Sequence, residues 1–163
     1  MLKCPRGLAL ISLVYVLTSC GLSSQQKAAT KEAMVALGKV QAATQVGVNF
    51  AQYSSLVIEA KAKANQMAVI PNGALKDSIN SAVESYADAG QVWNERIQHG
   101  GDQANIWSKF GVGETLIPKY SLPVETGSFT PSLGESVRCD LAMQLIWAEA
   151  EKRYQQAVKQ APH

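Results

Sequence analysis

The sequence predicts an all-α fold: a three- to four-helix antiparallel bundle with a long loop, containing proline and glycine, before the last helix. In residues 50–67 and again in residues 75–97, apolar side chains recur at alternating steps of three and four, the spacing of one helix face. The short turn Pro71-Asn72-Gly73 separates the two segments. Because a short turn between amphipathic segments makes them antiparallel neighbours, we expect a helical hairpin there.

The first helical segment is predicted to run from Ala28 to Met67. It is rich in Ala, Gln, Lys and Val and contains no proline. A continuous helix of this length would measure about 60 Å, much longer than its expected partners, and Gly38 and Gly47 are candidate interruptions. We therefore expect a break near residues 45–48. The face predicted to pack against a neighbouring helix consists of Phe50, Tyr53, Val57, Ala60, Ala64 and Met67.

The second segment is predicted to be helical from Ala74 to Gln98. The run His99-Gly100-Gly101 should end it, with Gly100 in the left-handed conformation typical of helix caps. Asp102 is then expected to cap a short helix that reaches Trp107. The packing face of the second segment consists of Leu75, Ile79, Ala82, Tyr86, Gly90, Trp93 and Ile97.

Residues 111–131 are predicted to form a long loop, because three prolines and several glycines interrupt any regular pattern. Loops longer than about 15 residues are uncommon unless they are packed or functional. This one carries apolar side chains, so we expect it to be a strap that packs on the helices. The apolar residues of the strap are Leu116, Ile117, Tyr120, Leu122 and Phe129.

The last helix is expected to begin at Thr130-Pro131 or at Ser132 and to continue to about Lys159. Ser132 and Glu135 have the spacing of a capping box. Residues 133–148 are apolar on most sides, which is typical of a buried helix. We therefore expect this part to be the central element, between the hairpin and the strap.

The first 20 residues have the layout of an export signal. Lys3 and Arg6 precede an apolar run from Leu8 to Leu17. A membrane-spanning helix needs about 20 apolar residues, so this run is too short to span comfortably. Two small residues, Thr18 and Ser19, follow it and lead to Cys20 and Gly21.

The run Leu17-Thr18-Ser19-Cys20 resembles the lipobox of bacterial lipoproteins. The resemblance implies a diacylglyceryl group on the Cys20 thiol, cleavage between Ser19 and Cys20, and acylation of the new amino terminus. Gly21 is not the aspartate that retains enterobacterial lipoproteins at the inner membrane, so a site on the outer membrane facing the periplasm is favoured. An ordinary secretory signal cleaved near Thr18 and Ser19, or an uncleaved anchor, would also fit residues of this kind.

Three regions follow from this reading: a signal peptide over residues 1–19, a lipidated tether over 20–27, and a single helical domain over 28–163. The 144 residues left after cleavage carry 13 basic and 13 acidic residues. Such a neutral chain lacks the basic face expected of a nucleic-acid-binding protein. Cys139 is then the only unmodified cysteine; burial in its apolar segment is expected, and pairing with another molecule is the alternative.

No catalytic or cofactor motif is evident. There is no Gly-x-Ser-x-Gly elbow, no Cys-x-x-Cys-His run, and only two histidines. Carboxylates and a histidine do share one stripe of the second helix, but it lies opposite the packing face, so we expect a solvated acidic face rather than a metal site. We therefore expect no cofactor, no metal and no enzymatic activity. The residues of the stripe are Asp77, Glu84, Asp88, Glu95 and His99.

The candidate contact surface lies outside the long helices and consists of Trp107, Leu116, Ile117 and Tyr120. Two functions are compatible with it. The first is a non-enzymatic interaction or structural role, in which the lipid on Cys20 holds the domain at the membrane and another envelope protein binds it. The second is a helical binding module, in which the hairpin, the last helix and the strap enclose a small apolar or amphipathic ligand.

Overall fold

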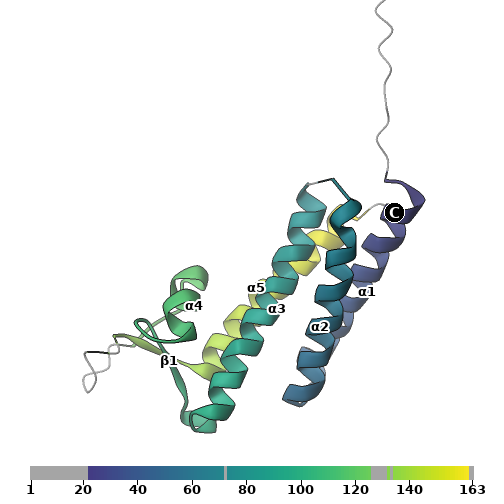
Figure 1. Ribbon diagram of the computed structural model, residues 1–163. Helices are drawn as coiled ribbons and strands as arrows, with labels where there is room; N and C mark the ends of the chain where they lie inside the picture. Colours follow the sequence, from purple (N-terminus) through teal and green to yellow (C-terminus); the bar gives the residue numbers. More distant parts are fainter. Residues whose placement is uncertain (1–21, 72, 126–131, 133, 162–163) are drawn as a thin grey trace, which may run out of the picture.

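The computed structural model describes residues 22–71, 73–125, 132 and 134–161, and this part of the chain is mainly helical (Figure 1). The all-α class is therefore confirmed, with a small two-stranded sheet that was not predicted. The helices are α1 (Ser24–Val46), α2 (Phe50–Gln66), α3 (Ala74–Gln98), α4 (Val112–Tyr120) and α5 (Cys139–Gln160). The strands are β1 (Asn105–Trp107) and β2 (Ser136–Arg138), which pair antiparallel.

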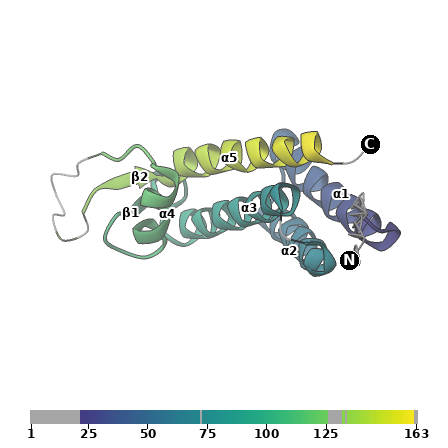
Figure 2. The same ribbon diagram turned by 90° about the horizontal axis from the view of Figure 1, so that it is seen from above.

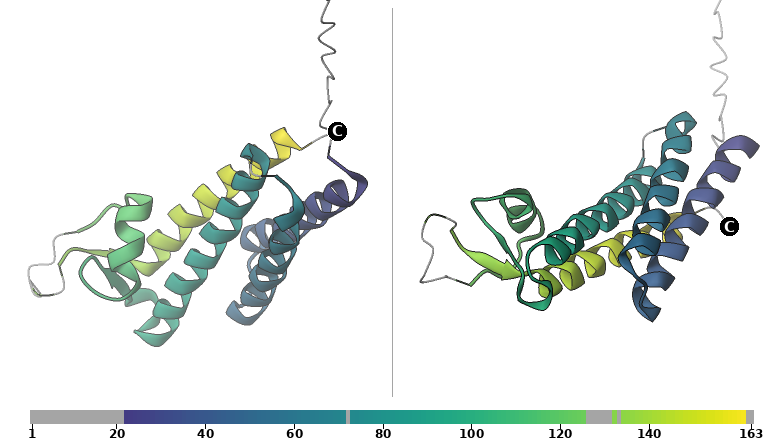
Figure 3. Two further views of the ribbon diagram at one scale, coloured as in Figure 1. Left: turned by 45° about the horizontal axis from the view of Figure 1, so that its top comes forward. Right: turned by 60° about the horizontal axis from the view of Figure 1, so that its bottom comes forward.

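Successive long helices run in alternating directions along the molecule (Figure 1). α3 and α5 share the most extensive helix contact, and α1 packs chiefly against α2. Seen from above, α3 and α5 lie side by side, with α1 and α2 against one half of their length and α4 and the strands at the other end (Figure 2). Two further views show the same elongated arrangement (Figure 3).

The first hydrophobic core lies between the four long helices. Five of the six residues predicted for the packing face of α2 are buried in it: Tyr53, Val57, Ala60, Ala64 and Met67. The sixth, Phe50, is half-buried and packs against the Trp93 ring. The Tyr53 hydroxyl donates to the Tyr86 carbonyl at 2.6 Å and accepts from Trp147 Nε1 at 3.0 Å. One buried side chain of α2 is thereby fixed to both α3 and α5.

The second hydrophobic core lies between the second half of α3, the first half of α5 and the α4 segment. Leu116, Ile117 and Leu122 contribute to it, so this part of the apolar strap packs on the helices as predicted. Phe129 lies outside the described residues. Cys139 is buried there as well, which confirms the expected burial of its thiol.

The helix boundaries around the hairpin agree with the sequence. Gly47, at φ +84°, interrupts the first helical segment where a break was expected, and the Asn49 side chain accepts from Gln52 N to cap α2. α3 spans the predicted residues, Ala74–Gln98, with His99 as its C-cap and Gly100 left-handed. Ile97 is the exception on the predicted face of α3, because its side chain is 55% exposed.

The prediction of an irregular loop over residues 111–131 is wrong in its first half, where α4 forms. Pro118 lies near the end of α4 and removes only one backbone donor, and the burial of Leu116 and Ile117 outweighs that loss. The predicted short helix reaching Trp107 is also wrong. Gly101–Gln103 is a 3₁₀ turn, and residues 105–107 form β1 instead.

The last helix begins later than predicted, at Cys139. Residues 136–138 are drawn into a strand because they pair with β1, with Ile106 opposite Val137. The expected capping box is absent: Gly134 has a φ of +80°, and Glu135 N donates to Ser108 Oγ at 3.0 Å. Thr130 and Pro131 lie outside the described residues.

Two further expectations need correction. Leu141 and Leu145 of α5 are 39% and 38% exposed, so this helix is not buried on all sides. The predicted tether over residues 20–27 is too long, because Ser23 and Gln26 form a capping box and α1 begins at Ser24. Within the described residues, no helix has the length and hydrophobicity needed to cross a membrane.

Gly113→Ala is expected to destabilise the protein by about 1–3 kcal/mol through overpacking. A Cβ atom at Gly113 would lie 2.3 Å from the Trp107 carbonyl oxygen and 2.6 Å from its nitrogen, and strand backbone cannot move aside easily. Gly90→Ala is the matched control, because its Cβ would meet only Tyr53 Cε1, at 3.4 Å. Thermal unfolding should show a lower melting temperature for the first variant only; equal melting temperatures would contradict this packing.

Burial, together with the nearby acids Glu95 and Asp140, raises the pKa of the Cys139 thiol to about 11, although Arg96 acts in the opposite direction. At pH 8 the thiolate should then be about a thousandth of the thiol. We expect iodoacetamide to leave Cys139 unmodified in the native protein at pH 8 and to alkylate it after unfolding in urea. Rapid alkylation of the native protein, followed by mass spectrometry, would show that the thiol is accessible.

Candidate functional site

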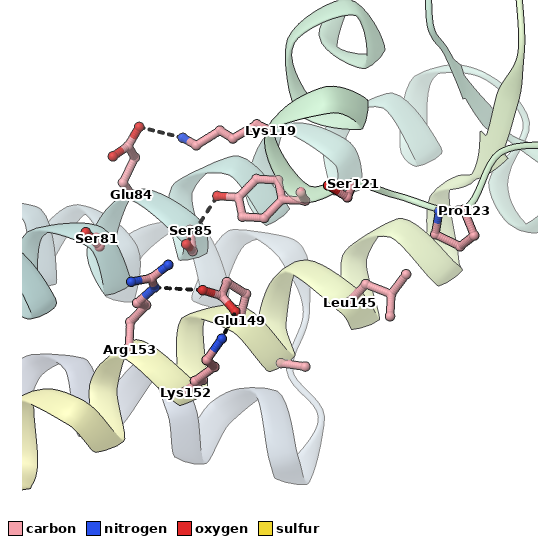
Figure 4. A pocket seen from close by; sticks show the side chains of 12 residues that line it. Ser81, Glu84, Ser85, Lys119, Ser121, Pro123, Leu145, Glu149, Lys152 and Arg153 are labelled. Carbon is pink, nitrogen blue, oxygen red and sulfur yellow. Dashed lines mark hydrogen bonds and ion pairs between the residues drawn. The ribbon is translucent and has the colours of Figure 1, made fainter.

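A groove opens between α3, α5 and the end of α4, with a volume of about 630 Å³ (Figure 4). Lys119 approaches from the end of α4, and Ser121 directly follows that helix. Glu84 approaches from α3 and Leu145 from α5. The groove falls in the size range of small-molecule sites. The complete lining is Ser81, Glu84, Ser85, Lys119, Tyr120, Ser121, Pro123, Leu145, Ala148, Glu149, Lys152 and Arg153.

One wall of the groove rests on a buried carboxylate, Asp88, which is only 6% exposed. Its Oδ2 atom lies 2.7 Å from Lys119 Nζ and 2.7 Å from the Tyr120 hydroxyl. Lys119 also bonds Glu84, and the Tyr120 hydroxyl lies 3.2 Å from Ser85 Oγ. The expectation of a solvated acidic face is therefore wrong at Asp88, because this carboxylate fixes the end of α4 to α3.

The pKa values in this wall follow from its contacts. Partial burial alone would lower the pKa of Lys119, but hydrogen bonds to Asp88 and Glu84 outweigh it, and the pKa is raised. Burial raises the pKa of Tyr120 to about 12, with the Ser85 bond acting against this and the Asp88 bond adding to it. Lys119 therefore stays charged and Tyr120 stays protonated near neutral pH, so the two residues act as fixed donors to Asp88.

The opposite wall belongs to α5. Glu149 accepts from Arg153 Nε at 2.7 Å and from Lys152 Nζ at 3.2 Å (Figure 4). Partial burial would raise the pKa of Glu149, but these two hydrogen bonds lower it overall. Each of these charged side chains has an internal partner. One negative charge is left over where Lys119 meets Glu84 and Asp88, and one positive charge where Glu149 meets Lys152 and Arg153. Hydroxyl groups and the apolar side chains of Pro123, Leu145 and Ala148 are left to face a ligand.

The structure places the predicted contact residues in different environments. Leu116 and Ile117 are buried in the second core, whereas Tyr120 is half-buried in the groove wall. Trp107 lies on β1 beside a separate hollow that it shares with His99 and Phe110. These residues therefore do not make one continuous exposed surface. Cys20 lies outside the described residues.

Several groove residues were not singled out from the sequence, among them Ser81, Ser85 and Arg153. One signal was available: Ser81, Ser85 and Asp88 follow steps of four and three, so they share one polar row beside the apolar face of α3. The partner of that row, Lys119, could not be found from spacing, because it lies 31 residues from Asp88 in a segment predicted to be irregular.

The described residues contain no group of three or more histidine, cysteine, aspartate and glutamate side chains arranged to hold a metal ion. His99 lies far from the groove serines along α3 and pairs with Glu95, with 3.1 Å between Nδ1 and Oε2. Comparison of the chain with protein-family models, with curated proteins and with solved structures gave no match.

Asp88→Asn is expected to lower the free energy of unfolding by about 1–3 kcal/mol. The buried carboxylate accepts hydrogen bonds from Lys119 and Tyr120, and a neutral amide would accept them more weakly. Glu84→Gln is the matched control. Glu84 binds the same lysine, but its side chain is 64% exposed, and exposed pairs contribute about 0–1 kcal/mol. Urea denaturation should separate the two variants. Equal losses would mean that Asp88 does not dominate the attachment of α4.

Proposed function

We propose that this chain is a bacterial lipoprotein, anchored by lipid on Cys20, whose helical domain has a non-enzymatic interaction role in the cell envelope. The domain is then a four-helix antiparallel bundle with a small unit of α4 and two strands at one end. The absence of the inner-membrane aspartate at Gly21 favours the periplasmic side of the outer membrane.

One structural observation carries the proposal. Leu22 packs against the first core, and α1 begins at Ser24. Cys20 precedes Leu22 by two residues, a reach of about 7 Å. The lipid would therefore join the folded domain almost directly, and the membrane would lie against the end where α1 begins.

The opposite end would face away from the membrane. α3 has 25 residues, which gives it a length of about 37 Å, and it leads to the unit of α4 and the strands. Phe110 is 67% exposed at this end, beside Trp107. An exposed aromatic side chain next to a half-buried tryptophan is typical of a protein contact, so we place the partner's contact here.

A second candidate function is favoured by the groove at Tyr120. Its volume and its mixture of hydroxyl groups and apolar side chains suit a small amphipathic ligand. The exposed Leu145 side chain would contact the apolar part of such a ligand, and the Ser81 and Ser121 hydroxyls its polar part. In this case the contact at Phe110 would be unnecessary.

Cys20→Ser is expected to abolish lipid attachment and to leave the signal peptide uncleaved, because the thiol is the acceptor of the diacylglyceryl group. The test expresses both forms with a radiolabelled fatty acid and compares their electrophoretic mobility and label. The matched control is Cys4→Ser, which removes a cysteine within the signal and should change neither readout. A Cys20→Ser protein that is still processed and released would contradict the lipoprotein proposal.

Phe110→Ser is expected to abolish copurification of an envelope protein partner, with the melting temperature unchanged because the side chain is mostly exposed. The measurement extracts the lipidated protein gently in detergent and identifies stoichiometric companions by mass spectrometry. Val35→Ser, at a side chain 53% exposed on α1, is the control and should keep the partner. A bound small molecule that is lost in Leu145→Glu, with no protein partner, would instead support the groove function.

A further inference from the structure

We infer that the end of the domain where α1 begins is a basic surface that rests on anionic lipid headgroups, so that the domain stands end-on at the membrane. This inference rests on the proposed lipid at Cys20. We call this end the near end, and it consists of residues 22–32, 63–71, 73–77 and 154–161. It gathers the start of α1, the turn between α2 and α3, and the end of α5 (Figures 1 and 3).

Side-chain contacts hold these segments together. Ser78 Oγ lies 3.2 Å from the Gln160 side-chain oxygen, which joins the start of α3 to the end of α5. Ile79 and Ala157 are fully buried in the first core together with Ala33 of α1. The helix segments that carry the charged groups of the near end are therefore packed into one unit.

The near end carries five lysines and two acidic residues, a net charge of +3. Lys63 is compensated by Glu32 at 2.7 Å. Within the described residues, no ion pair is recorded for the exposed Lys27, Lys31 and Lys159. Lys76 donates to the Ile70 carbonyl at 2.9 Å, which leaves its charge uncompensated. Several ammonium groups are thus available to bind lipid phosphates.

The other surfaces are less suited to an anionic membrane. The far end, residues 95–125 and 134–140, carries four basic and six acidic residues by sequence, a net charge of −2. Along the sides, Lys39 is paired with Glu59 at 2.8 Å and Lys152 with Glu149 at 3.2 Å. The charge distribution therefore favours one orientation, with the near end toward the lipid.

The distances are short enough for this attraction to act. Charges in solution are screened over about 8 Å at physiological ionic strength. Lys27 lies five residues after Leu22, about 7 Å along the helix, so the first turns of α1 lie within about one screening length of the short link from Cys20. Attraction of basic residues to anionic lipid falls off over the same distance, so the lipid anchor and the lysines act together.

Fluorescence resonance energy transfer from a labelled protein to an acceptor lipid in vesicles tests this orientation. The full lipidated chain is labelled with a fluorophore at Ala74→Cys, near the membrane, or at Thr115→Cys on α4, since Cys139 is buried. Each protein is reconstituted into phosphatidylcholine vesicles with or without phosphatidylglycerol, with an acceptor lipid present. We expect phosphatidylglycerol to increase transfer from residue 74 and to decrease transfer from residue 115. High salt should abolish both changes.

The triple variant Lys27→Gln, Lys31→Gln and Lys159→Gln should lose both responses to phosphatidylglycerol. The control Lys39→Gln, Lys109→Gln and Lys152→Gln removes the same charge elsewhere and should keep them. If the triple variant responds like the unsubstituted chain, or if that chain shows no response, the inference is overturned. Intact mass before reconstitution tests the lipid on Cys20 separately, so a chain without lipid refutes the proposed function itself.

Discussion

The contact between α3 and α5 is the constraint on which the rest of the structure depends, because both hydrophobic cores are built on it. At one end the pair is covered by α1 and α2, and at the other by α4 and the two strands. The Tyr53 hydroxyl fixes α2 to this pair through bonds to Tyr86 and Trp147. A buried hydroxyl that satisfies two partners is costly to remove, since each partner would be left unpaired.

The second core also contains a buried polar interaction that joins two helices, α3 and α4. Asp88 is buried at the point where α4 ends, and it is stabilised by Lys119 and Tyr120 of that helix. A charge in this position is tolerated only with such partners. The same contacts shape the groove, so the attachment of α4 and any ligand that the groove binds share one set of side chains.

Much of the helical framework could be predicted from local sequence. The apolar faces of α2 and α3 follow from residues three and four apart. The break at Gly47 and the turn at Gly100 that follows α3 also depend on residues close together in the chain. β1 and β2 could not be predicted in this way, because Ile106 and Val137 pair across about 30 residues and each strand has only three residues. The same applies to the groove, whose walls meet only after α4 has packed.

Errors in the prediction share a physical cause, which is that tertiary contacts outweighed local signals. Pro118 was expected to interrupt regular structure. Residues 112–120 are helical nonetheless, because the helix buries the neighbouring side chains Leu116 and Ile117. The spacing of Asp88 around the helix axis placed it in a solvated acidic stripe. In the structure it is buried, because Lys119 of α4 binds it. Ser132 and Glu135 had the spacing of a cap, but strand pairing at residues 136–138 delayed the helix.

The proposed function depends most on a direct junction between the proposed lipid at Cys20 and a domain that is packed from Leu22 onward. The most direct test is mass spectrometry of the amino-terminal peptide of the mature protein from its own cells. The account predicts a peptide that begins at Cys20 and carries the mass of a diacylglyceryl group, with or without a further acyl chain. A peptide with an unmodified Cys20, or one that begins after it, would contradict the account.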